Sequence, residues 1–254
     1  MPENVVEIPT TQPRETKPRS REKVITPQER EIKGVWEAIQ FVDGFAKQRK
    51  RVIDEQTVKE IHQRVMRHFH PEVAGRYRDY EVGIKRAIFL PPHWSEVKTS
   101  MWQFGKDLEV KTSKLSTSLS GIEDAVRIGA WAHYEFVKTH PFADGNGRTA
   151  RLLTDLIFKR VGLYYITDWG SQNEEYIDVL RRVDENNDLR HFVRFLARKL
   201  VYRFEEIEGK LGRGAISQYA KKSPLLVDLK NRRLELLRIS KTQDFQPAIE
   251  GGIK

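Results

Sequence analysis

The stretch from His140 to Arg151 contains the side chains of this sequence that are best suited to a reaction. It reads HPFADGNGRTAR, and it combines one histidine, one aspartate, one asparagine, two glycines and two arginines. Histidine titrates near pH 6.5, so His140 can serve as a general base close to neutrality. Asp144 offers the hard oxygen ligands that suit a Mg²⁺ ion bridging phosphates. A base and a metal ligand this close together favour a reaction centre.

The second half of the stretch favours binding of an anion. We expect a turn over 144–147 and a helix that begins near Arg148. Gly145 and Gly147 would allow positive φ, so that consecutive amides point into one concavity, and the first helical turn adds its unpaired amides. Arg148 and Arg151 lie three apart, at the end of a helix where the dipole disfavours cations. A phosphate held between these arginines and the amides explains their position.

Ordinary structural interpretations compete with this one. His140 alone could be a C-cap, and Asn146 could be the N-cap of an unremarkable helix connection. The coincidence of a base, a metal ligand, a nest of amides and two arginines within one turn favours the chemical interpretation.

The surrounding elements are predicted to be helices. Thr26-Pro27-Gln28-Glu29 forms a capping box before the first of them. Apolar residues recur at helical spacing over 26–42, 54–69, 97–108, 122–136, 152–157, 173–185, 188–208 and 224–239. Residues 82–92 instead favour short extended segments ended by Pro91-Pro92, which predicts a small β-hairpin. The fold class is therefore all-α, with a disordered or regulatory tail (1–25), a helical domain (26–210) and a C-terminal helical extension (211–254).

Composition limits the classes of function. The chain has 254 residues, a net charge of +9 and no cysteine, which excludes disulfides, thiolate metal sites and cysteine nucleophiles. There is no apolar run long enough to span a membrane and no apolar core of a secretion signal, so a cytoplasmic location is expected. The basic residues are dispersed, which makes nucleic acid an unlikely partner.

The twelve residues also match every fixed position of the signature His-x-Phe-x-Asp/Glu-Gly-Asn-Gly-Arg-x-x-Arg, so the sequence resembles the Fic family. GRYRDYEVGIKRAIFLPP (75–92) is similar to the hairpin of that family, called the flap. SQNEEYIDVL and DLRHFVRFL are similar to the two helices that close its core. The resemblance covers roughly 30–205. It implies a protein adenylyltransferase, which transfers AMP from Mg²⁺-bound ATP to a Ser, Thr or Tyr hydroxyl of a target protein and releases pyrophosphate.

The resemblance also implies a role for each matching residue. His140 would be the general base, Asp144 the Mg²⁺ ligand, and Phe142 a buried anchor of the loop. The nucleotide and its phosphates would be bound by Gly145, Asn146, Gly147, Arg148, Arg151 and Tyr176. The flap would dock the target chain as an added strand through Lys85, Arg86, Ala87, Ile88, Phe89 and Leu90.

Alternatives to AMP transfer stay open. Related Doc-type proteins phosphorylate instead, with Lys in place of the second glycine, whereas this chain keeps Gly147 and Arg151. Removal of AMP or transfer of another nucleotide would use the same loop. A non-catalytic nucleotide-sensing or peptide-docking module is the other class. In that case the basic helix at 224–239 could present Leu225, Leu229 and Leu236 to a partner, although such a stripe more often packs on its own domain.

Control of the site has two candidate sources. Many Fic proteins carry an inhibitory pattern, Ser/Thr-x-x-x-Glu-Gly/Asn, and the nearest match is TQPRET at 11–16, with Glu15 in the glutamate position. Thr16 stands where Gly or Asn belongs, and Pro13 and Pro18 oppose a helix. Inhibition by Glu15 and inhibition by a separate partner protein are both compatible with this sequence.

Overall fold

The fold is formed by α-helices, as the apolar spacing predicts. The computed structural model describes residues 25–84, 90–166, 169, 174–211 and 224–242. Its elements are α1 (Pro27–Lys47), α2 (Glu55–Met66), η1 (Trp94–Glu96), α3 (Val97–Ser113), α4 (Leu119–Thr139), α5 (Asn146–Arg160), α6 (Glu174–Asn186), α7 (Arg190–Leu211) and α9 (Pro224–Lys241). Within the described residues the only β pairing is an isolated antiparallel bridge between Tyr77 and Phe142. The all-α prediction is confirmed.

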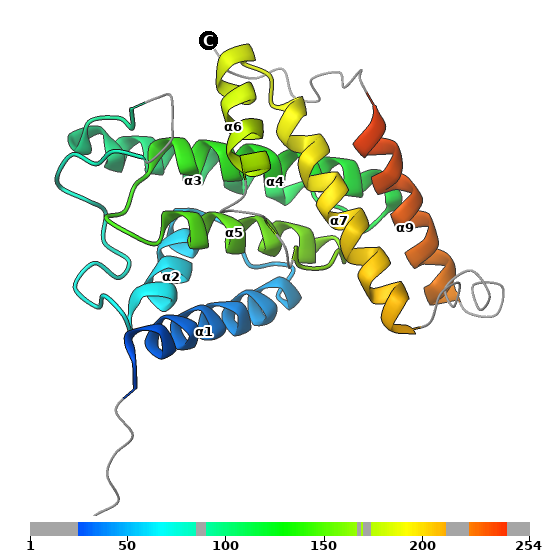
Figure 1. The fold of residues 1–254 in the computed structure, drawn as a ribbon, viewed down its shortest axis with the longest axis horizontal. Coiled ribbons are helices and arrows are strands. Elements are labelled where there is room, and N and C mark those ends of the chain that lie inside the picture. Colours follow the sequence, from blue (N-terminus) through cyan, green and yellow to red (C-terminus); the bar gives the residue numbers. More distant parts are fainter. Residues whose placement is uncertain (1–24, 85–89, 167–168, 170–173, 212–223, 243–254) are drawn as a thin grey trace, which may run out of the picture.

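Helix α5 lies in the middle of the molecule (Figure 1). It packs against α4, α1 and α2, and its apolar residues Leu153, Leu156 and Phe158 are completely buried. The helix that follows the polar loop is therefore held on several sides. Its first turn, which carries the two arginines, has its position fixed by this core.

Helices α1 and α2 start where local capping predicts. Thr26 and Glu29 form the reciprocal capping box of α1, and Asp54 caps α2 together with Thr57. The end of α2 differs from the prediction, because the helix stops at Met66 and Phe69 lies in the turn beyond it. A proline restricts the residue before it to extended conformations, so Pro71 ends the helical pattern that the apolar spacing alone would extend.

The predicted hairpin is not seen in the part of 82–92 that the structure describes. Residues 82–84 and 90–92 contain no strand. The flap residues Lys85, Arg86, Ala87, Ile88 and Phe89 lie outside the described residues, as do Glu15 and the rest of the first 24 residues. Leu90 is described, and it is 87% exposed. The prediction of a target-docking strand is therefore not tested here.

Helix α9 packs on its own chain, against α7 and α4 (Figure 1). Leu236 and Ile239 are fully buried. Arg232 donates to the carbonyl of Val161 at 2.6 Å and to that of Thr117 at 2.9 Å. The stripe thus packs on the domain at Leu236, whereas the side chain of Leu225 lies outside those described. No helix in the described part of the chain is long and apolar enough to cross a membrane.

Candidate active site

The candidate site is the short loop between α4 and α5. His140 is the C-cap of α4 and takes the left-handed conformation (φ 46°, ψ 57°), while its amide donates to the carbonyl of Phe136 at 3.0 Å. The left-handed region is uncommon for a residue with a side chain. His140 is therefore a C-cap and a member of the loop at once, so the two interpretations of this residue do not exclude each other.

The two glycines serve different purposes, which corrects the prediction that both take positive φ. Gly145 does so (φ 76°) and is the N-cap of α5, and a Cβ there would lie 2.7 Å from Sδ of Met66. Helix α5 begins at Asn146, two residues earlier than expected, so Gly147 is already helical. A Cβ on Gly147 would lie 3.3 Å from Nη1 of Arg151, and glycine thus keeps space beside that guanidinium.

Asn146 holds the loop together through its side-chain amide. Its Oδ1 accepts from the amide of Phe142 at 3.0 Å, and its Nδ2 donates to the carbonyl of the same residue at 2.7 Å. Phe142 is completely buried, as expected of an anchor. Because both polar atoms of the Asn146 amide bind the loop, its part in an anion hole falls to the backbone N–H.

His62, on α2, contacts the loop through Phe142 and Asp144. It was not identified from the sequence. Its ring is stacked on Phe142 with centroids 3.6 Å apart and planes 3° from parallel. The amide of Gly75 donates to Nδ1 at 2.9 Å, so Nε2 carries the proton and donates to the carbonyl of Asp144 at 2.9 Å. Burial lowers the pKa of His62 to about 4. This neutral ring fixes the peptide that leads into Gly145.

His140 is held in the form that a base requires. Its Nδ1 faces the carbonyl of Val137 at 3.3 Å, which places the proton on Nδ1 and leaves the lone pair of Nε2 available. Burial lowers the pKa of His140 below its usual 6.5, and the charge of Arg78 lowers it further, against the opposing effects of Val137 and Asp144. The ring is therefore neutral at pH 7.

Arg148 bridges two carboxylates. Its Nη2 lies 3.0 Å from Oδ2 of Asp144, and its Nη1 lies 2.6 Å from Oε1 of Glu31 on α1. Burial would raise the pKa of Asp144, but the Gly145 amide and the charge of Arg148 outweigh it and hold that pKa below 3.8. Glu31 was not predicted as part of the site.

Arg151 is mostly buried and, within the described residues, no carboxylate forms an ion pair with it. The neighbouring carboxyl of Asp155 cannot serve as a full counter-ion, because burial raises its pKa to about 8. No described side chain caps the first turn of α5, so the amides there are also available. A partly desolvated guanidinium beside unpaired amides makes a favourable place for an anion.

Comparisons with known proteins give this loop a family. A model described as "Fic/DOC family" matches residues 52–158. The protein adenylyltransferase Fic of Nematostella vectensis is 35% identical over 173 residues, which is 66% of this chain and 37% of that protein. The protein of the same name from Culex quinquefasciatus is 33% identical over 167 residues, which is 66% of this chain and 31% of that protein. This chain therefore contains a domain of the Fic/DOC family. It spans about a third of the length of these curated relatives.

Solved Fic structures resemble this fold. Fic-1 of C. elegans (residues 134–508) matches with a TM-score of 0.60 and 28% identity, over 78% of this chain and 56% of that one. A Fic domain containing signaling protein from Bacteroides thetaiotaomicron matches with a TM-score of 0.58 and 19% identity, over 86% of this chain and 76% of that one. The second likeness concerns the fold alone.

The loop between α4 and α5, residues 140–145, is called the Fic loop below. Tyr176 lies near Arg151, which follows this loop, and it belongs to a buried chain of hydrogen bonds. Thr154 donates to the carbonyl of Ala150 at 2.8 Å, so its oxygen accepts from Nδ1 of His133 at 3.2 Å. Nε2 of His133, 2.7 Å from the tyrosine oxygen, then accepts from the Tyr176 hydroxyl. The polar atom of Tyr176 is thus bound inside the protein, and only 8% of the residue's surface is exposed.

The Fic loop offers a metal ion a single carboxylate. The described residues contain no group of three or more His, Cys, Asp or Glu side chains that could hold a metal. The Asp144 side chain is 50% exposed and ionised. Mg²⁺ is commonly bound by one or two carboxylates together with substrate phosphates and water. The single carboxylate therefore fits Mg²⁺ that arrives with a nucleotide.

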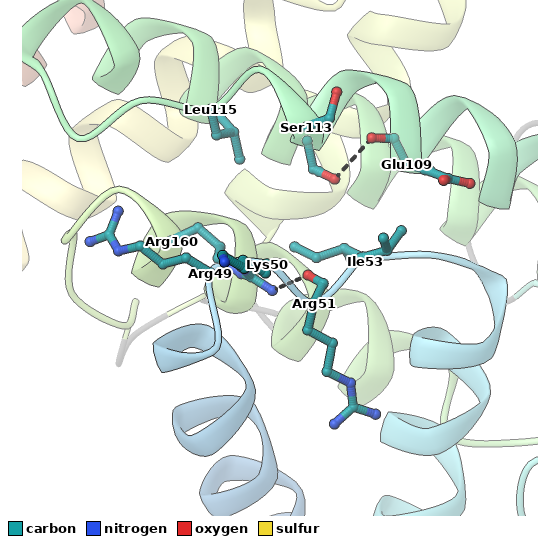
Figure 2. Close-up of a pocket in the computed structure, with 10 residues that line it drawn as sticks. Arg49, Lys50, Arg51, Ile53, Glu109, Ser113, Leu115 and Arg160 are labelled. Carbon is teal, nitrogen blue, oxygen red and sulfur yellow. Dashed lines mark hydrogen bonds between the residues drawn. The ribbon is translucent and has the colours of Figure 1, made fainter.

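A separate hollow of about 310 Å³ lies at the other end of α5, about 20 Å from the Fic loop along a 15-residue helix. It is lined by Arg49, Arg51 and Arg160, among others (Figure 2). Arg160 donates to the backbone carbonyl of Arg51. The side chain of Arg51 extends away from the other lining residues (Figure 2), and its Nη2 lies 3.1 Å from Oε2 of Glu60. Arg160 thus binds the backbone of the connection between α1 and α2, and Arg51 pairs with a carboxylate of α2.

Proposed function

We propose that this chain is a protein adenylyltransferase, which transfers AMP from ATP to a Ser, Thr or Tyr hydroxyl of a target protein and releases pyrophosphate. One observation carries the proposal: a neutral histidine, an ionised aspartate and a guanidinium that forms no ion pair with any described carboxylate border the start of one helix, where no described side chain caps the amides. The names of the curated relatives, protein adenylyltransferase Fic, support it.

The start of α5 would bind the triphosphate. Arg151 has no described carboxylate partner to give up, and the first-turn amides add donors in fixed directions. Arg148 would exchange Glu31 and Asp144 for phosphate oxygens. Its pairs have half-exposed carboxylates, 40% and 50% accessible, and such pairs contribute little, about 0–1 kcal/mol each. Phosphate can therefore replace them at small cost.

His140 would then activate the target hydroxyl. Its Nε2 takes the hydroxyl proton while the oxygen forms a bond to the α-phosphorus of ATP. The bond from that phosphorus to the oxygen bridging the α- and β-phosphates breaks, and pyrophosphate leaves with the electron pair. A positioned base contributes about 10²- to 10⁴-fold, and the remaining acceleration comes from holding and neutralising the phosphates.

Asp144 would hold Mg²⁺, which when bound supplies positive charge to the α- and β-phosphates. Lys85 to Leu90 would dock the target chain, and Tyr176 would contact the adenine. We also propose that 26–210 form the Fic domain with 211–254 as an extension. Control would come from Glu15 or from a separate inhibitory protein. Deleting residues 1–25 separates these, because only inhibition by Glu15 would be relieved.

The test uses ATP labelled at either end. The purified chain, alone and with a cell lysate, is incubated with Mg²⁺ and ATP carrying the label on the α- or the γ-phosphate. We expect protein to become labelled when the label is on the α-phosphate and not when it is on the γ-phosphate. Mass spectrometry should find added AMP on a hydroxyl residue. Label from the γ-position would indicate phosphorylation, and no label with intact ATP binding would indicate a binding module. His140→Ala, the control, should bind ATP and transfer none.

A further inference from the structure

Arg78 is a buried cation outside the signature, and its partners are all backbone carbonyls. Only 4% of its surface is exposed. Nε donates to the carbonyl of His140 at 2.9 Å, and Nη1 donates to that of Tyr80 at 3.0 Å. Nη2 donates to the carbonyl of Pro92 at 2.6 Å, with a longer contact of 3.5 Å to that of Thr139. None of the carboxylates in the described residues forms an ion pair with it.

These carbonyls belong to two parts of the backbone, the end of α4 and the residues on either side of 81–91. Thr139 and His140 are at the carboxyl end of α4, where the last carbonyls lack helical partners and the dipole favours a cation. Tyr80 and Pro92 flank the segment 81–91. The backbone amide of Arg78 adds a bond to the carbonyl of Pro141, at 2.9 Å. One residue thus ties both ends of 81–91 to the histidine of the Fic loop.

We propose that Arg78 is a positioning residue for AMP transfer, whose guanidinium holds the backbone of Tyr80 and Pro92 at a fixed place relative to His140. This inference rests on the proposed function. Arg78 is too far from solvent to touch a substrate, and it acts through the backbone that it binds. If the target chain docks between Tyr80 and Pro92, as the proposed function has it, its hydroxyl meets Nε2 of His140 only while the carbonyls bound by Arg78 keep their places.

Arginine is required by geometry as well as by charge. Its planar guanidinium presents five N–H donors in fixed directions, which suits carbonyls arranged around it. Lysine keeps the charge but ends in one compact ammonium group, which cannot reach Tyr80, Pro92 and His140 together. Arg78→Lys therefore removes the clamp and retains the cation, and it should fold where an uncharged variant would leave four buried carbonyls unpaired.

The experiment compares Arg78→Lys with wild type and with Arg76→Lys, a matched control two residues away at an exposed arginine. Steady-state AMP transfer gives kcat, KM for ATP and KM for the acceptor. For Arg78→Lys we expect kcat to fall about ten- to a hundredfold, since small misplacements of reacting groups have effects of this size. The KM for ATP should stay within about twofold of the wild-type value, because the substitution does not touch the protein groups at the start of α5 that would bind the triphosphate. Arg76→Lys should match wild type.

Hydrogen exchange measured by mass spectrometry tests the clamp without any activity. Peptides covering 76–84 and 139–145 should exchange faster in Arg78→Lys, while those of α7 should not change. Wild-type kcat in Arg78→Lys would overturn the proposal, as would faster exchange throughout the chain or a parallel loss of ATP binding, both of which indicate a general structural role. If the wild-type protein transfers no AMP, the proposed function fails, and the exchange result still decides whether Arg78 clamps the loop.

Discussion

Acidification should destabilise this protein through His62, the buried ring under the Fic loop. Burial lowers the pKa of His62 to about 4, whereas an unfolded histidine has a pKa of about 6.5. Between these values the unfolded chain binds a proton that the folded chain does not, so stability is complete above pH 6.5 and is lost as the pH falls toward 4. From pH 7.5 to pH 5 the loss is RT ln[(1 + 10^1.5)/(1 + 10^−1)], about 2 kcal/mol.

His133 should also lower the free energy of unfolding when the pH falls. Burial lowers its pKa to about 3, and the same expression gives about 2 kcal/mol between the two pH values. Together the two rings should remove about 4 kcal/mol. Asp155 acts in the opposite direction: burial raises its pKa to about 8, so its protonation in the folded protein should return about 3 kcal/mol between the same pH values, and the net loss should be about 1 kcal/mol. Urea unfolding followed by tryptophan fluorescence and circular dichroism at pH 7.5 and 5 measures this difference.

His62→Phe separates the contribution of His62. Phenylalanine keeps a ring on Phe142 but leaves the Gly75 amide and the Asp144 carbonyl unpaired, which should cost about 2–6 kcal/mol at pH 7.5. The further loss on going to pH 5 should be about 2 kcal/mol smaller than in wild type. Ile61→Ala, at a fully buried neighbour, should lower the free energy of unfolding by about 2–5 kcal/mol. Its change in that free energy between pH 7.5 and 5 should equal the wild-type change. If the free energy of unfolding changes equally between pH 7.5 and 5 in wild type and in His62→Phe, then His62 is not the neutral, hydrogen-bonded ring described above.

Three further predictions concern the loop itself. Gly145→Ala should lower the thermal unfolding temperature by the equivalent of about 1–3 kcal/mol, because φ is 76° and the new Cβ would meet Met66; an unchanged temperature would contradict the left-handed turn. Glu31→Gln should tighten ATP binding up to about fivefold by calorimetry, because Arg148 loses a competing carboxylate; weaker binding would mean that Glu31 orients the arginine. Mg²⁺ should tighten ATP binding in wild type and not in Asp144→Asn, and an equal effect of Mg²⁺ on both would remove Asp144 as its ligand.

The helices could be predicted where the determinants are local. The capping box of Thr26 and Glu29 and the N-cap Asp54 lie beside the turns that they start, and the start of α1 is confirmed. The same local logic placed the start of α5 two residues late, because glycine is a poor helix former. The first helical turn tolerates Gly147, since its amide would be unpaired in any case.

The contacts that hold the site could not be predicted in the same way. Glu31 meets Arg148 across 117 positions, and His62 meets the Asp144 carbonyl across 82. Such pairs depend on how α1 and α2 lie against α5. A partial signal existed for His62, which lies beside Ile61 on the inner face of α2, where a polar residue must find a buried partner.

The arrangement of partners explains why the loop can be both rigid and reactive. Asn146, His62 and Arg78 are buried, and each forms at least one hydrogen bond to the loop backbone. The backbone of the loop is therefore shaped by residues that need not touch a substrate. The lone pair on Nε2 of His140 and the Arg151 guanidinium are left without described partners, as preorganised catalysis requires. Substitutions in the first set should therefore reduce stability or alignment, whereas substitutions in the second should reduce transfer at nearly constant stability.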